Sequence, residues 1–403
     1  MLMHRQLLLA PTALLLLCST ACAWAQTEDT FKPHVGYSLL SDSNLFRLPA
    51  GANLDTLIGK SSAAEQIGVT TVGLSVNKAY SLQRFELDLN LVDYKYKNFD
   101  YLNFTAHNYS AAWRWALTPR LIGDLTTDRK EALNSFADYQ GFNQRNQRTN
   151  TNTVFDGAYE INGPWRVLAG VSKSTQTNLQ PLLTGDDYSE TAANTGLRYV
   201  FSSGSTLSYI LKKANGQYLN RPLSQADFLD DGYNQTDNEF KLHWPVTGKS
   251  TVDLTATHIN RTHPHFAERD YSGVTAGVNF NWNMTGKSAL TAGWVRELAN
   301  YQTSSSNYAQ TDRFSIGPVW QASAKIVVRL RYELAQLNYL GSPSGLAASQ
   351  RSDTTRDTSL SVEWQPYQRV TLSASLQNAT RASNLPNLDY DSNMATISAK
   401  FSY

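Results

Sequence analysis

The amino-acid sequence predicts an all-β fold, namely a transmembrane outer-membrane β-barrel of about eighteen antiparallel strands. Three observations predict this fold: long segments alternate apolar and polar residues, a tryptophan-containing turn recurs along the chain, and short connections alternate with long ones. The main alternative is a soluble propeller, whose blades pack four short strands into about 40–45 residues. Here three copies of the turn, which begin at Trp244, Trp282 and Trp320, are 38 residues apart, a spacing that fits one pair of long strands.

Alternation with a period of two defines the strands. Every second residue from Phe85 to Leu91 is apolar, and the residues between them are polar. The same scheme returns from Ile326 to Leu334, as a strand with one apolar and one polar face requires. Many of these segments run to about 10–15 residues, whereas globular strands average about 5–6 and a tilted membrane strand needs about 9–11. Strands are expected at 31–40, 64–79, 83–98, 104–115, 120–132, 147–161, 165–177, 189–201, 206–216, 234–244, 250–261, 270–282, 288–297, 311–320, 326–338, 354–364, 370–381 and 390–403.

One short segment occurs twice, as Trp244-Pro-Val-Thr-Gly-Lys-Ser250 and as Trp282-Asn-Met-Thr-Gly-Lys-Ser288. Looser relatives place a cation five residues after the tryptophan, at Trp115-Ala-Leu-Thr-Pro-Arg120, Trp320-Gln-Ala-Ser-Ala-Lys325 and Trp364-Gln-Pro-Tyr-Gln-Arg369. Alternating residues flank each copy, so each is predicted to be a tight turn between two strands. The tryptophans are expected to join an aromatic girdle at the periplasmic interface.

The connections alternate in length, which is typical of a barrel with short periplasmic turns and long extracellular loops. The chain also ends in an alternating segment, 395–403, that finishes on an aromatic residue. Such an ending is characteristic of outer-membrane barrels and indicates the barrel-insertion machinery as a partner. Short connections are expected at 80–82, 116–119, 162–164, 202–205, 245–249, 283–287, 321–325 and 365–369, and long ones at 41–63, 133–146, 178–188, 217–233, 262–269, 298–310, 339–353 and 382–389.

Residues 1–25 are predicted to be a cleaved signal peptide, because the apolar run at 7–17 is too short to span a bilayer and Ala23-Trp24-Ala25 is a small-x-small cleavage site. Lipoprotein processing at Cys22 is a weaker alternative. The remaining residues, 26–403, are expected to form a single barrel domain in the outer membrane.

Composition and motifs predict a protein without enzymatic activity. The formal net charge is +1, which argues against nucleic-acid binding. Both cysteines lie in the predicted signal peptide, so thiol chemistry is not expected. The Gly-Lys-Ser triplets are not phosphate-binding loops, since His243 and Asn281 stand where that motif needs glycine. No catalytic residue, cofactor or metal is predicted; solvated loops are favoured over metal sites at His258, His263, His265, Asp227, Asp230 and Asp231.

The polar faces of the strands are the candidate functional surface. A barrel of this size is wide enough for an aqueous channel, and the charged side chains of its wall select what passes. Several tyrosines are expected either to stack on sugar rings or to form the outer aromatic girdle. The residues predicted to line the lumen are Glu86, Asp88, Asp156, Glu160, Glu239, Lys241, Arg329, Arg331, Glu333 and Glu363. The tyrosines are Tyr94, Tyr96, Tyr101, Tyr188, Tyr218, Tyr233, Tyr271, Tyr308 and Tyr339.

After the first predicted strand stands the motif Asp42-Ser43-Asn44-Leu45-Phe46-Arg47-Leu48-Pro49. It resembles the start of the EpsL family, outer-membrane proteins of exopolysaccharide biosynthesis systems linked to exosortase and PEP-CTERM sorting. The resemblance extends to chain length, signal peptide, barrel-like body and aromatic C-terminus, and it implies no catalytic residues. It implies polysaccharide, outer-membrane lipid and other export components as partners. Physically, the motif is a polar turn followed by an amphipathic stretch, either an inward plug or an ordinary surface loop.

The sequence and the resemblance together predict an outer-membrane component that passes polysaccharide to the cell surface or assists its passage. Two alternatives remain open. One is a general or substrate-specific diffusion porin, and the other is a non-conducting barrel that anchors polysaccharide or assembly partners.

Overall fold

The computed structural model describes residues 30–137, 140, 143–180, 185–300, 306–342 and 351–403. The predicted signal peptide at 1–25 lies outside these residues and stays a prediction. Eighteen antiparallel strands form one closed wall, in which each strand pairs with its sequence neighbours and β1 pairs with β18. The expected fold class is therefore confirmed, and so is the strand count.

The strands are 12–16 residues long, as the sequence periodicity predicts for strands that cross a membrane at a tilt. They are β1 (Phe31–Asp42), β2 (Glu65–Tyr80), β3 (Gln83–Tyr96), β4 (Phe104–Thr118), β5 (Leu121–Leu133), β6 (Gln147–Asn162), β7 (Trp165–Asn178), β8 (Tyr188–Val200), β9 (Thr206–Tyr218), β10 (Gly232–Thr247), β11 (Ser250–Thr262), β12 (Tyr271–Trp282), β13 (Ser288–Asn300), β14 (Tyr308–Ser323), β15 (Ile326–Leu340), β16 (Ser352–Tyr367), β17 (Val370–Ser383) and β18 (Tyr390–Ser402). Short helices occur in the connections: α1 (Leu54–Ile58), η1 (Asp100–Leu102) and η3 (Ala267–Arg269). None of the described helices is long and apolar enough to cross a membrane.

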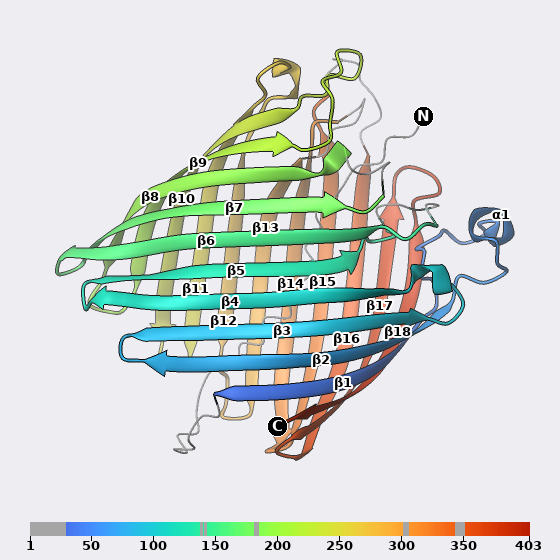
Figure 1. Cartoon of the computed structure of the whole chain (residues 1–403), viewed down its shortest axis with the longest axis horizontal. Coiled ribbons are helices and arrows are strands. Elements are labelled where there is room, and N and C mark those ends of the chain that lie inside the picture. Colours follow the sequence, from blue (N-terminus) through green and yellow to red (C-terminus); the bar gives the residue numbers. More distant parts are fainter. Residues whose placement is uncertain (1–29, 138–139, 141–142, 181–184, 301–305, 343–350) are drawn as a thin grey trace.

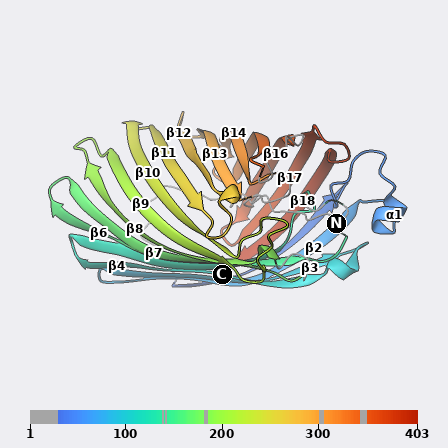
Figure 2. The same ribbon diagram turned by 90° about the horizontal axis from the view of Figure 1, so that it is seen from above.

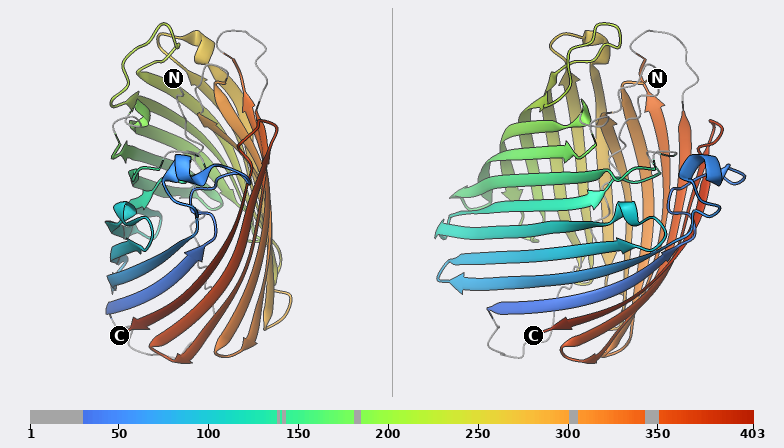
Figure 3. Two further views of the ribbon diagram at one scale, coloured as in Figure 1. Left: turned by 90° about the vertical axis from the view of Figure 1, so that its right-hand side faces the viewer. Right: turned by 45° about the vertical axis from the view of Figure 1, so that its right-hand side comes forward.

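The two ends of the barrel differ in the length of their connections. Tight turns join the strands at one end, and longer loops, including the one that carries α1, join them at the other (Figure 1). Seen from above, β4–β9 form one side of the wall and β12–β18 the other (Figure 2). The first and last strands lie side by side, so the sheet has no free edge (Figure 3).

A hydroxyl group three residues after the tryptophan explains the repeated turn. Thr247 Oγ1 accepts the backbone N–H of Lys249 at 3.1 Å and lies 2.7 Å from the Ser250 hydroxyl. The second copy repeats both distances. The corresponding hydroxyl–amide pairs of the other copies are Thr118 with Arg120 at 3.2 Å and Ser323 with Lys325 at 3.1 Å. The last copy has Tyr367 at this position, and there the Gln365 side chain donates to the Gln368 carbonyl instead.

Apolar side chains are exposed on one face of the wall. Phe85, Leu89 and Leu91 are each more than 40% exposed, while the residues between them in β3 are polar. An outer-membrane barrel turns this apolar face toward lipid, so the polar face is the inner one. The tryptophans of four turn copies are exposed on the apolar face, as a girdle requires: Trp244, Trp282, Trp320 and Trp364.

Trp115 departs from the expected girdle because it is only 8% exposed. It lies against the backbone at Gly123 and Gly157, two glycines that are paired across β5 and β6, and it stacks on Phe155 at 5.7 Å. The absence of side chains at both glycines makes room for the indole ring.

Candidate functional site

Ion pairs that cross between neighbouring strands characterise the polar face of the wall. On β3–β5, the Arg114 guanidinium lies 3.2 Å from Glu86 and 3.0 Å from Asp124, and Glu86 also lies 3.0 Å from Arg84. Asp124 is directly opposite Asp156 in the register of β5 and β6. Within the described part of the chain, Asp156 has no ion-pair partner. This part of the wall therefore holds three carboxylates around two guanidinium groups.

A hydrogen-bond network around the Asp88 carboxylate continues from this cluster toward β1. Asp88 accepts hydrogen bonds from Ser75 at 2.6 Å and from Asn90. The Asn90 side-chain oxygen lies 2.9 Å from His34 Nε2. Each of these side chains is adjacent in the sequence to an apolar residue of the opposite face. Since neighbouring strand residues point to opposite faces, the network lies on the polar face.

A second charged cluster lies on β13–β16. Glu333 lies 2.6 Å from Arg331 and 3.0 Å from Arg313, and Arg329 lies 3.3 Å from Glu363. The three arginines come from two neighbouring strands, β14 and β15. Arg313 also lies 3.5 Å from Glu297 on β13, so the three guanidinium groups are matched by three carboxylates.

Shorter pairs occupy the remaining wall. Glu239 lies 2.7 Å from Lys241 on β10, and Glu160 lies 2.8 Å from Arg166 near the β6–β7 turn. The register and the alternation place all ten residues predicted to line the lumen on the polar face. Nine of them have an ion-pair or hydrogen-bond partner among the described residues, so the wall carries both signs of charge close together.

The motif Asp42–Pro49 forms a tight hydrogen-bonded turn directly after β1. The Asn44 side chain donates to the Leu48 carbonyl at 2.8 Å and accepts the Leu48 N–H at 3.0 Å. Arg47 has a left-handed backbone, φ 55°, and its guanidinium pairs with Asp42 at 2.8 Å. The turn is fastened to β18, because the Ser392 hydroxyl donates to Asp42 at 2.6 Å and Asn393 N–H donates to Ser43 at 2.8 Å.

This turn directs Phe46 into an apolar cluster at the loop end of the barrel. Phe46 is 1% exposed and contacts Phe99 and Phe136 edge-on or tilted, with ring centroids 4.8 and 4.6 Å away. The cluster includes Ile67 and Val92, which share the polar face of β2 and β3 with Asp88. The segment after β1 therefore folds over the inner face of β2–β4, and α1 follows at the loop end (Figure 1).

A second group of loop residues joins the connections 219–231 and 263–270 to residues 306–307. Arg269 is 1% exposed, donates to the carbonyls of Phe228 and Asp227, and also bonds the side chain of Asn307 at 3.0 Å. Burial lowers the pKa of Arg269 to about 10, so the guanidinium stays charged at neutral pH. An isolated arginine in a loop gives no periodic signal, and the sequence therefore did not single it out.

Asp230 and His265 connect the same loops. Asp230 accepts the backbone N–H of His265 at 2.7 Å, and its other oxygen lies 3.0 Å from His265 Nδ1. The potential ligand atoms of these two residues and of Asp231 lie within 4.8 Å of one another. Because both Asp230 oxygens already accept hydrogen bonds, the arrangement acts as a cap of the His265 loop rather than as a metal centre. His258 is not part of this group and lies beside Ser272 on β11–β12.

Most of the tyrosines considered for sugar stacking are packed against arginines or the wall. Tyr218, Tyr233 and Tyr339 are 8%, 4% and 1% exposed. The guanidinium of Arg221 lies 3.5 Å from the Tyr218 ring centroid, and that of Arg261 lies 3.8 Å from the Tyr233 centroid. A guanidinium group already covers a face of each of these two rings. This contact contradicts the hypothesis that the rings stack on sugars at these positions.

Comparisons with known proteins give structural likeness only. No family model matches the chain, and no curated protein matches it significantly. The solved structure of OpdK (OccK1) from Pseudomonas aeruginosa is similar with a TM-score of 0.51 at 13% identity, over 93% of this chain and 99% of that chain. OccK2 (OpdF) of the same organism is similar with 0.52 at 11%, over 92% and 98%, and a BenF-like porin from Pseudomonas fluorescens Pf-5 with 0.51 at 13%, over 93% and 99%. At this identity the likeness shows the fold: the chain is a closed eighteen-stranded β-barrel built like these outer-membrane porins.

Proposed function

We propose that the barrel is a passive, substrate-selective diffusion channel for small polar solutes. The observation that carries this proposal is the charged polar face of a closed wall of eighteen strands. Barrels of about 16–18 strands leave an aqueous channel, and rings of charged side chains set which ions and solutes enter it. The ten residues predicted to line the lumen are its proposed selectivity surface.

Three arginines close together on the polar face suit solutes that carry a carboxylate. Arg313, Arg329 and Arg331 lie together on β14 and β15, and a guanidinium binds a carboxylate in a planar, bidentate manner. Solved structures of the similar barrels hold small carboxylates, vanillate in OpdK and glucuronate in OccK2. Their glutamate partners keep these arginines oriented in the absence of a solute.

Single-channel recording of the full chain in planar bilayers tests the proposal. We expect stepwise conductance, and replacement of Arg329 and Arg331 by glutamine is expected to shift the reversal potential in a salt gradient toward cation selectivity. Arg356→Gln is the matched control, because this exposed arginine lies on the apolar face of β16. Folded protein without conductance would favour the anchoring alternative, and an equal shift in the control would exclude the arginine cluster as the selective element.

Polysaccharide export is the second candidate function, and the motif Asp42–Pro49 favours it through its resemblance to the EpsL family. In this function the segment after β1, held by Phe46, lies where polymer leaves the barrel. The test compares secreted and periplasmic polysaccharide in a strain that lacks the gene. Polymer retained in the periplasm, and secreted again when the intact gene is restored, supports export; unchanged secretion rejects it and leaves solute diffusion.

A further inference from the structure

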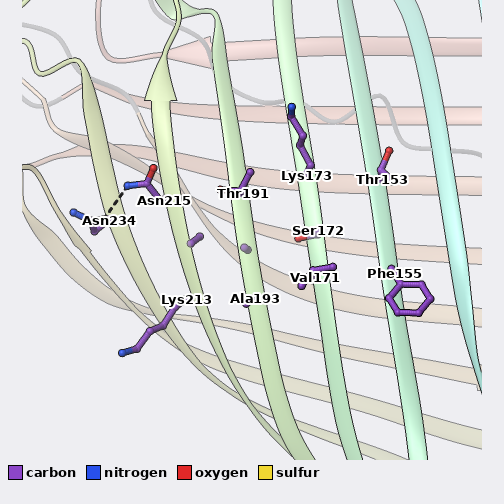
Figure 4. Close-up of a pocket in the computed structure, with 12 residues that line it drawn as sticks. Thr153, Phe155, Val171, Ser172, Lys173, Thr191, Ala193, Lys213, Asn215 and Asn234 are labelled. Atoms are coloured by element: carbon purple, nitrogen blue, oxygen red, sulfur yellow. Dashed lines mark hydrogen bonds between the residues drawn. The ribbon is translucent and has the colours of Figure 1, made fainter. Parts of the chain in front are cut away.

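The lipid-facing side of the wall carries a shallow depression on β6–β10. Its volume is about 580 Å³, and its lining includes Lys173 and Lys213 (Figure 4). The register aligns its residues in two rows across the strands. The row nearer the loops is polar, Lys173–Thr191–Asn215–Asn234, and the next row toward the turns is Phe155–Val171–Ala193–Lys213.

Both rows belong to the outer face of the barrel. Phe155 and Val171 are 43% and 53% exposed and continue the apolar face to which Trp165 also belongs. Lys173 and Lys213 alternate with inward residues such as Lys212, which pairs with Glu190 at 3.4 Å. The long loops mark the extracellular end, so the polar row lies toward the outer leaflet.

The two lysines of this depression have no protein partner among the described residues. Neither ammonium forms an ion pair or a hydrogen bond with any described residue, and both side chains are exposed. Two other cations on this face are neutralised: Lys95 lies 3.4 Å from Asp93, and Arg296 lies 2.8 Å from Asp312. Arg356 on β16 also has no partner among the described residues, but its register neighbours, Leu334 and Thr380, are uncharged, so it is not one of a pair of cations. A lone cation toward lipid is destabilising unless an anion accompanies it.

Register and chemistry define what fits the depression. Lys173 is opposite Thr191 and Lys213 is opposite Ala193, so the two Cα atoms are separated by two strand spacings and two residues, roughly 12 Å. Two extended lysine side chains can bracket a phosphate group at this distance. The amide and hydroxyl groups of the polar row suit a sugar or glycerol headgroup, and Phe155, Val171 and Ala193 suit acyl chains.

We propose that this depression binds a phosphorylated, acylated lipid of the outer leaflet, with its phosphate between Lys173 and Lys213. The lipid neutralises the two lysines and holds β6–β10 against the membrane. This binding site is on the opposite face from the proposed channel and does not depend on conduction.

Native mass spectrometry of the full chain tests the proposal by counting bound lipid. The probes are diphosphoryl lipid A and the same lipid without phosphates. We expect the wild-type barrel to retain the phosphorylated form selectively, and Lys173→Gln/Lys213→Gln to weaken its retention by at least about tenfold, since charge-assisted contacts are lost. Arg356→Gln is the matched control, because Arg356 lies eight residues from the girdle residue Trp364, as Lys173 lies eight from Trp165.

Three results would overturn the proposal: equal retention of both lipids by the wild type, unchanged retention in the double variant, or an equal loss in the Arg356→Gln control. Displacement of the lipid by equimolar inorganic phosphate would also overturn it, since it would indicate a small-anion site. Unheated electrophoretic mobility verifies that each variant is folded. If the double variant does not fold, the comparison of the two lipids on the wild type still decides the question.

Discussion

At the scale of single residues, the contact between Asp230 and His265 makes the loop end sensitive to pH. The hydrogen bond with Asp230 raises the pKa of His265. Burial acts to raise the pKa of Asp230, but hydrogen bonds from His265 outweigh it and the pKa is lowered. Stabilisation by the histidine is therefore present below its ordinary pKa and is lost as pH rises through the raised one. Stabilisation by the aspartate is lost as pH falls through its lowered pKa, so the contact is strongest between roughly pH 4 and 6.5.

We expect NMR titration of labelled histidines in the full chain to give His265 a pKa above the usual value of about 6.5. Asp230→Asn is expected to return it toward that value, because the hydrogen-bonded carboxylate is removed. His263 is an internal comparison, since burial lowers its pKa to about 4, at the lower end of this range. A His265 pKa that does not respond to Asp230→Asn would contradict the assigned contact.

Two paired glycines beneath Trp115 allow a graded test of packing on the outer face. A Cβ atom at Gly123 would lie 2.2 Å from the Asp156 carbonyl oxygen and 2.4 Å from Trp115, whereas at Gly157 its nearest neighbour is Trp115 at 3.3 Å. We expect Gly123→Ala to lower the free energy of unfolding by about 1–3 kcal/mol through overpacking.

Gly157→Ala is the matched control, with a smaller effect, because reduced freedom of the unfolded chain offsets a milder contact by about 0.4–1 kcal/mol. Denaturant unfolding in detergent micelles, followed by tryptophan fluorescence, measures both variants. Equal effects at the two positions would show that the ring moves aside freely.

At the scale of elements, the segment after β1 shows why a motif alone did not decide between a plug and a surface loop. Its sequence offers a polar turn and an amphipathic stretch, which fit either arrangement. The outcome depends on partners far along the chain, since Phe46 packs on Phe99 and Phe136 and Asp42 is bonded by Ser392. Periodicity reports which face a strand residue occupies, but it carries no information about such contacts.

Phe46→Ala is expected to release this segment by removing the aromatic side chain at the centre of its cluster, a loss of about 3–5 kcal/mol for a buried phenylalanine. Hydrogen exchange of the amides at 43–63 measures the local opening. Leu57→Ala on α1 is the control in the same segment, because Leu57 is 36% exposed and should change exchange little. Similar exchange in the two variants would mean that Phe46 does not hold the segment in place.

At the scale of the whole molecule, the wall was predictable because a closed barrel imposes one rule on every strand. Each strand must alternate and each must pair with its neighbour in sequence, so patterns such as Phe85–Leu91 determine the strand, its facing and its partners together. The repeated turns also predicted where pairs of strands reverse direction. A side-chain hydroxyl such as that of Thr247 stabilises each of these reversals by accepting a backbone N–H. Loop contacts were not predictable, because they join residues that are far apart in the chain. The proximity of the two unpaired lysines on the outer face was not predictable either, because it depends on the register between strands.

The facing of the whole wall is open to a direct test with single cysteines. Both natural cysteines lie in the predicted signal peptide, so a mature chain cleaved there has no competing thiol. In lipid vesicles we expect Glu86→Cys to react with a membrane-impermeant thiol reagent and Leu87→Cys to resist it, because adjacent strand residues point to opposite faces. Ser361→Cys and Leu360→Cys repeat the comparison on β16. Reaction at the two leucine positions alone would show that the charged face is turned toward lipid, and would remove the basis for a channel. Reaction at Glu86 and Ser361 alone would show that the ion pairs of the inner wall are accessible to water.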